Sequence, residues 1–92
     1  MTPSKAENLL ERMRRSQAGW RRTDLEKLYR GFGFDIRHGS NHDVIVHPNY
    51  PHLRATLPGH TTVVKAYIRH AIKLIDELRQ LGQGEEDVSD NQ

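Results

Sequence analysis

The sequence predicts an α+β fold in which two helices cover a three-stranded antiparallel sheet as a two-layer sandwich, with an extra helix at the N-terminus. Three observations lead to this fold class. Three segments carry apolar residues at the spacing of one helix face. Three shorter segments, all between the second and third helices, alternate apolar and polar residues as strands do. The turns that join these short segments are rich in Gly, Asn and Pro, and short turns favour antiparallel pairing.

The N-terminal helix is predicted within residues 1–18, where Ser4 and Glu7 have the spacing of a capping box. Its apolar stripe consists of Ala6, Leu9, Leu10 and Met13. The compact domain is predicted to span residues 19–81. Trp20, near its start, is expected to pack on the core, with stacking on a nucleobase as the alternative.

The second helix is predicted to begin at Thr23, because Thr23 and Glu26 also have capping-box spacing. Its apolar stripe consists of Leu25, Leu28, Tyr29 and Phe32. Two glycines mark its end, and Gly33 is the better candidate for the left-handed position that follows a helix.

The three strands are predicted at 34–38, 43–47 and 53–57. Their alternating apolar positions are Phe34 and Ile36, then Val44 and Val46, then Leu53, Ala55 and Leu57. Each strand is therefore expected to bury one face and to expose the other.

The final helix has the strongest helical pattern in the chain and is predicted to start at a cap formed by Thr61 or Thr62. Its apolar stripe consists of Val64, Ile68, Ala71, Ile75 and Leu78. It is predicted to end by Gly82. Residues 82–92 contain four acidic and no basic side chains, and they are expected to form an acidic, disordered tail.

The charge is distributed unevenly along the chain. Because four of the 12 acidic residues lie in the tail, residues 1–81 carry 14 basic and 8 acidic side chains, a net charge of +6. A basic body favours a polyanionic partner such as a nucleic acid, although small domains also use charge for solubility alone.

The length of 92 residues allows one small domain. The absence of cysteine rules out disulfides and thiolate metal sites. No apolar run reaches the roughly 20 residues of a membrane span, and the N-terminal segment is charged where a signal peptide would be apolar. We therefore expect a cytoplasmic protein that does not associate with a membrane.

Six histidines raise the question of a metal centre. Those at 38, 42, 47 and 52 recur every four or five residues, a spacing that does not converge on a hairpin, and no His-Glu-x-x-His pattern is present. A zinc site is therefore a minor alternative. The chain also lacks a Gly-x-Ser-x-Gly nucleophile turn and a phosphate-binding loop of the Walker type.

Acid–base chemistry by a single histidine remains as a catalytic possibility, because imidazole exchanges protons near neutral pH. His42 follows the polar turn Gly39-Ser40-Asn41, where the turn becomes a strand. RNA supplies its own nucleophile, the 2′-hydroxyl. A protein need only move protons and stabilise the phosphate charge, with no metal or small-molecule cofactor.

Several motifs together resemble the HicA toxins, the YcfA-like family of bacterial toxin–antitoxin systems. They are Gly31-Phe32-Gly33-Phe34, Gly39-Ser40-Asn41-His42, Val46-His47-Pro48 and Leu57-Pro58-Gly59-His60, followed by a terminal helix. The resemblance covers about residues 20–80. It implies a fold like that of a double-stranded-RNA-binding domain, cleavage of mRNA through a histidine, and neutralisation by a HicB-type antitoxin.

The resemblance implies His42 as the catalytic residue. The family usually has Gly-Ser-His at this turn, so counting forward from Gly39 would place Asn41 at the histidine position. Counting back from the strand places His42 there, and strand register fixes side-chain direction more firmly than turn length does. The residues expected to contact RNA are Arg37, Ser40, Asn41, Arg54, His60 and Lys65.

Three functions are compatible with the sequence. The leading one is a metal-independent endoribonuclease toxin. The second is a non-catalytic RNA-binding module of the same fold, which would read RNA shape and phosphates. The third is a protein-interaction domain whose histidines are incidental.

Overall fold

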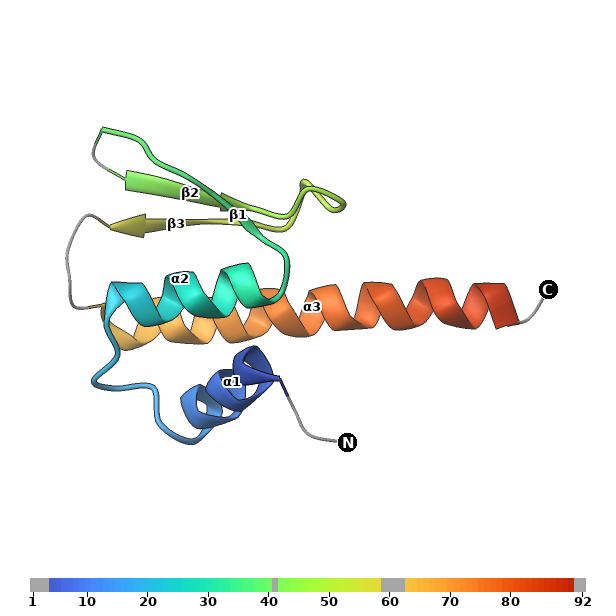
Figure 1. Cartoon of the computed structure of the whole chain (residues 1–92), viewed down its shortest axis with the longest axis horizontal. Helices are drawn as coiled ribbons and strands as arrows, with labels where there is room; N and C mark the ends of the chain where they lie inside the picture. Colours follow the sequence, from blue (N-terminus) through green and yellow to red (C-terminus); the bar gives the residue numbers. More distant parts are fainter. Residues whose placement is uncertain (1–3, 41, 59–62, 91–92) are drawn as a thin grey trace.

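The computed structural model of this chain describes residues 4–40, 42–58 and 63–90. Within these residues the chain forms three helices and a three-stranded antiparallel sheet, so the predicted α+β class is confirmed (Figure 1). In chain order the elements are α1 (Lys5–Arg15), α2 (Arg22–Gly31), β1 (Asp35–Arg37), β2 (His42–Val46), β3 (Arg54–Pro58) and α3 (Lys65–Asp90). None of the helices in this part of the chain has a stretch long and apolar enough to cross a membrane.

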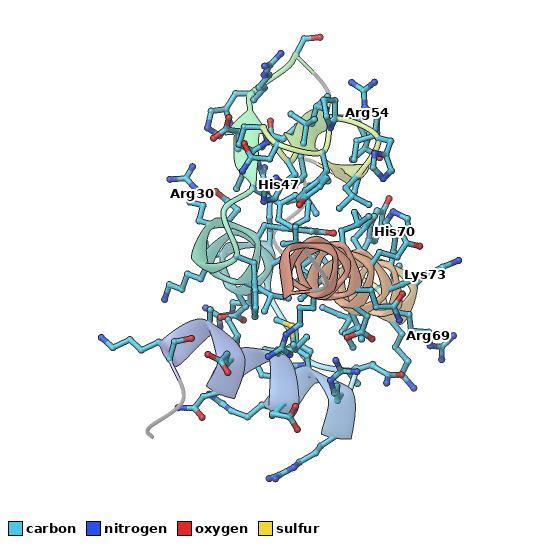
Figure 2. All side chains as sticks on the ribbon, turned by 90° about the vertical axis from the view of Figure 1, so that its right-hand side faces the viewer. Arg30, His47, Arg54, Arg69, His70 and Lys73 are labelled. Atoms are coloured by element: carbon cyan, nitrogen blue, oxygen red, sulfur yellow. The ribbon has the colours of Figure 1, made fainter. Side chains whose placement is uncertain are left out.

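The elements are stacked in layers (Figures 1 and 2). Helices α2 and α3 lie side by side beneath one face of the sheet, and α1 lies against the side of this helix pair that faces away from the sheet. Leu10 and Met13 of α1 are completely buried, and Arg14 forms an ion pair with Asp76 of α3. None of the described helices covers the opposite face of the sheet, which is called the open face below.

The sheet has β2 in its centre, with β1 and β3 as its edges. Its register aligns Ile36, Ile45 and Ala55 in one row, and their side chains point toward the helices. Ile45 and the predicted core residues of β3 are buried, so the predicted core face of β3 is confirmed.

The structure contradicts the predicted apolar face of β2. Asp43, Ile45 and His47 are the buried residues of this segment, whereas Val44 and Val46 are only half-buried and belong to the open face. Asp43 and His47 are polar residues at core-facing positions, so the apolar residues alone indicate the wrong face. Both can be buried because Asp43 forms an ion pair with Arg22 and His47 accepts a hydrogen bond from Asn49. A shift of one residue in a strand exchanges the two faces.

The ends of the helices agree with the sequence pattern in part. The Ser4 hydroxyl accepts a hydrogen bond from the backbone N–H of Glu7, which is one of the two hydrogen bonds of the predicted capping box. Gly33 has a φ of 89°, so its predicted left-handed position is confirmed. The predicted capping box at Thr23 is wrong. Helix α2 begins one residue earlier, where the Asp24 carboxylate accepts a hydrogen bond from the backbone N–H of Arg21.

Helix α3 differs from its prediction at both ends. It begins at Lys65, so Val64 precedes it and is 62% exposed, and Val63 is the buried residue instead. At the other end it continues past Gly82 to Asp90, where the sequence predicted a disordered tail. A glycine inside a helix costs about 1 kcal/mol relative to alanine, which weakens a helix without ending it.

Trp20 packs against the core, as predicted. Its indole N–H donates a hydrogen bond to the carbonyl oxygen of Ser16 at 2.7 Å. The guanidinium of Arg12 lies over the indole ring, 5.3 Å from its centre. Trp20 therefore fixes the connection between α1 and α2.

Candidate functional site

The candidate site lies at the turn end of the β1–β2 hairpin. This hairpin is tight. A Cβ atom added to Gly39 would lie 2.5 Å from the carbonyl oxygen of His42, so only glycine fits here without movement of the backbone. The backbone N–H of Gly39 donates a hydrogen bond of 3.3 Å to Oδ1 of Asp43. Backbone and side chain together hold the end of the hairpin in place.

His42 is the first residue of β2, and its side chain is exposed on the open face. Alternation along β2 places it on the same face as Val44 and Val46. Val44 pairs with Arg37 and Val46 pairs with Arg54. Directly paired residues share a face, so both arginines lie on the open face with His42.

The separations within this group follow from strand geometry. Arg37 is a diagonal neighbour of His42, which corresponds to a separation of roughly 7–8 Å. Arg54 pairs with Val46, which is four residues beyond His42 along β2, so Arg54 and His42 are separated by roughly 13 Å. One histidine and two guanidinium groups therefore follow the direction of β2 across the open face, an arrangement that suits an extended polyanion.

The structure does not bring the other predicted site residues into this group. Ser40 is exposed in the turn, and Lys65 is exposed at the start of α3, in the helix layer. Asn41 and His60 lie outside the described residues. Arg37, His42 and Arg54 are thus the predicted site residues that share one surface.

Sequence reasoning missed a second group at the same hairpin, centred on Asp43. The carboxylate of Asp43 is buried, and it forms an ion pair with Arg22 of α2. Its Oδ2 atom lies 3.2 Å from Nδ1 of His38, whose side chain is 66% exposed. Arg22 is in turn 3.4 Å from the carboxylate of Glu26. Asp43 is two residues from Ile45 and therefore shares its face, but the alternation of Val44 and Val46 fits the strand pattern equally well.

This group can orient an imidazole. A buried carboxylate beside one ring nitrogen of a histidine fixes the ring and leaves the other nitrogen directed outward. The Oδ2 atom of Asp43 contacts both the guanidinium of Arg22 and the Nδ1 atom of His38, so one carboxylate holds both side chains. The hairpin thus carries two exposed histidines, His42 on the open face and His38 beside Asp43.

His47 has a structural role. It is 6% exposed and its ring makes edge contacts with Phe34, 5.0 Å between ring centres. Its Nδ1 atom accepts a hydrogen bond from the backbone N–H of Asn49 at 3.1 Å. This histidine is packed in the core and is not available to a substrate.

Among the described residues, no three His, Asp or Glu side chains gather as metal ligands. Comparison of the chain with protein-family models, with curated proteins and with solved structures finds no match.

Proposed function

We propose that this chain is a metal-independent endoribonuclease of the HicA toxin kind, with the fold of a double-stranded-RNA-binding domain. The observation that carries the proposal is the grouping of His42, Arg37 and Arg54 on the open face. The order α2-β1-β2-β3-α3, with both helices beneath one face of the sheet, supports the proposed fold.

In the proposed reaction the RNA backbone lies along β2 on the open face. His42 transfers a proton, either from the 2′-hydroxyl that attacks the phosphorus or to the 5′-oxygen that leaves. The P–O5′ bond breaks as the new P–O2′ bond forms. Arg37 and Arg54 offset the charge of the phosphates, since guanidinium groups bind phosphate through paired N–H donors.

The proposal includes the biological setting. The substrate is mRNA, the protein acts in the cytoplasm as the toxin of a type II toxin–antitoxin pair, and a HicB-type antitoxin neutralises it. The described part of the chain places no helix on the open face, so an antitoxin that covers this face would keep RNA away from His42.

The test is cleavage of RNA by the purified chain in EDTA. We expect the parent protein to cut RNA and His42→Ala to be inactive. His52→Ala is the matched control, because His52 is also exposed but lies in the turn before β3 and contacts Tyr50. Equal cleavage by His42→Ala and the parent would exclude His42 as the acid–base group.

A second candidate function is a non-catalytic RNA-binding module that uses the same surface. It is favoured by the fact that no hydrogen bond joins the His42 imidazole to the described residues, whereas His38 has Asp43 beside it. This function predicts binding that weakens steeply with salt while the RNA stays intact. A cleavage assay separates the two.

A further inference from the structure

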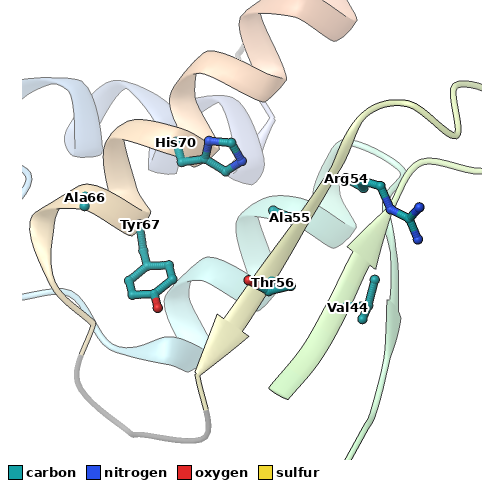
Figure 3. A pocket seen from close by; sticks show the side chains of 7 residues that line it. All are labelled: Val44, Arg54, Ala55, Thr56, Ala66, Tyr67 and His70. Atoms are coloured by element: carbon teal, nitrogen blue, oxygen red, sulfur yellow. The ribbon is translucent and has the colours of Figure 1, made fainter. Parts of the chain in front are cut away.

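A groove of about 500 Å³ lies between β3 and α3 (Figure 3). Arg54 and Thr56 of β3 form one side, together with Val44 of β2. Tyr67 and His70 of α3 form the other side, and both side chains point toward β3 (Figure 3). The volume is within the range of small-ligand sites, about 300–1,000 Å³.

The walls of the groove combine an apolar surface with basic side chains. Tyr67 is half-buried and presents an aromatic ring, and Ala66 beside it is exposed and small. His70 and Arg54 are exposed above these residues. Lys73, one helical turn beyond His70, extends the basic edge along the same side of the molecule (Figure 2). A flat aromatic group that carries a phosphate matches such walls in shape and in charge.

The groove is continuous with the open face. Val44, Arg54 and Thr56 belong to both, since Val44 pairs with Thr56 across the sheet and Arg54 pairs with Val46. An RNA strand that runs along β2 past His42 would therefore reach the groove at the β3 edge of the sheet.

We propose that this groove binds one unpaired nucleotide of the RNA, with its base against Tyr67 and Ala66 and its phosphate near Arg54 and His70. The inference rests on the proposed function, because it takes RNA as the ligand of the open face. It adds that the substrate is single-stranded where it leaves the open face, since a paired base cannot turn into a groove.

The test measures binding of a short 2′-O-methyl RNA, which the chain cannot cleave, by fluorescence anisotropy. Ala66→Glu places a carboxylate in the groove, and we expect it to weaken binding by about tenfold or more. Gln80→Glu is the matched control, because it adds the same charge at an exposed position of α3 outside the groove. Thermal melts of both variants establish that each is folded.

A second pair of variants tests the aromatic ring. Tyr67→Leu should weaken binding by about tenfold, and Tyr67→Phe should retain parental affinity, because stacking requires the ring and not the hydroxyl. An RNA with an abasic site at the position that occupies the groove should bind the parent protein less tightly than the intact RNA does. That RNA should lose no further affinity with Tyr67→Leu. A fully paired duplex should bind less tightly than the single strand.

The outcomes separate this proposal from the proposed function. If Ala66→Glu and Gln80→Glu bind RNA equally well, or the parent binds none, the groove is not a nucleotide site. Cleavage that depends on His42 would then still support the ribonuclease. RNA binding that depends on the groove, without cleavage by any form of the protein, would support the nucleotide site and would overturn the proposed ribonuclease function.

Discussion

The buried carboxylate of Asp43 lies 3.2 Å from the exposed imidazole of His38 and also pairs with Arg22, so one carboxylate joins the hairpin to helix α2. Breaking a buried ion pair by removing one partner leaves an uncompensated charge, whereas replacing both partners by apolar groups does not. The end of the hairpin therefore depends on a charge balance inside the protein, beneath the surface that carries His42.

Asp43→Asn should lower the free energy of unfolding by about 3 kcal/mol, because the positive charge of Arg22 would stay partly buried without its partner. Urea denaturation measures the loss. The double variant Arg22→Met, Asp43→Leu should recover most of it. Asp35→Asn is the control, since Asp35 is exposed on β1. An equal loss of unfolding free energy in Asp43→Asn and Asp35→Asn would exclude a specific role for the ion pair between Asp43 and Arg22.

Gly39→Ala should impair the site more than Ser40→Ala. The added Cβ would meet the carbonyl oxygen of His42 at 2.5 Å, and a backbone atom cannot rotate away as a side chain can. We expect a loss of about 1–3 kcal/mol in stability and displaced amide resonances around His42. Ser40 is exposed, and its truncation should leave those resonances unchanged. Unchanged spectra for Gly39→Ala would show that the hairpin relaxes freely.

Gly31 permits α1 and α2 to lie close together, since a Cβ added to it would overlap with Cβ of Ala6. Gly31→Ala should therefore reduce the free energy of unfolding by about 1–3 kcal/mol. The measurement is a urea titration of Gly31→Ala beside the double variant Ala6→Gly, Gly31→Ala. If the overlap is the cause, the double variant is the more stable of the two, even though glycine weakens α1 by about 1 kcal/mol.

Tyr29 should make the fold sensitive to alkali. It is 1% exposed, and burial raises the pKa of its phenol above the usual value. The folded state keeps a proton that the unfolded chain loses near pH 10. The stability of the fold is therefore unaffected by the ionisation of Tyr29 below about pH 10 and falls as the pH rises from there toward the raised pKa of Tyr29 in the folded state.

The check is chemical denaturation between about pH 8 and pH 11, where Tyr29→Phe should lose less stability than the parent because phenylalanine does not ionise. A decline equally steep in Tyr29→Phe and in the parent would assign the alkaline sensitivity to other groups.

The sequence predicts the parts of this fold that depend on local rules. The cap at Ser4, the left-handed Gly33 and the apolar face of β3 each follow from residues within four positions of one another. The phase of β2 was not predictable in this way. Asp43 is buried because Arg22, 21 residues earlier in the chain, folds against it. The pattern of polarity along β2 alone therefore indicated the wrong face.

The candidate site was predictable to a similar extent. Motif and charge indicate His42, Arg37 and Arg54 as site residues, and the register places them on one face. The pairing of His38 with Asp43 and the groove between β3 and α3 depend on contacts between distant elements, which no local pattern encodes.

Alternate residues of the β2 segment serve separate tasks. Asp43, Ile45 and His47 hold the interior together, whereas His42, Val44 and Val46 face outward. The two sets can consequently vary independently of each other. A library randomised at 42, 44 and 46 would vary the open face while most of its members still fold, and one randomised at 43, 45 and 47 would yield few folded members. This strand thus offers a starting point for designing new open faces on a chain of 92 residues.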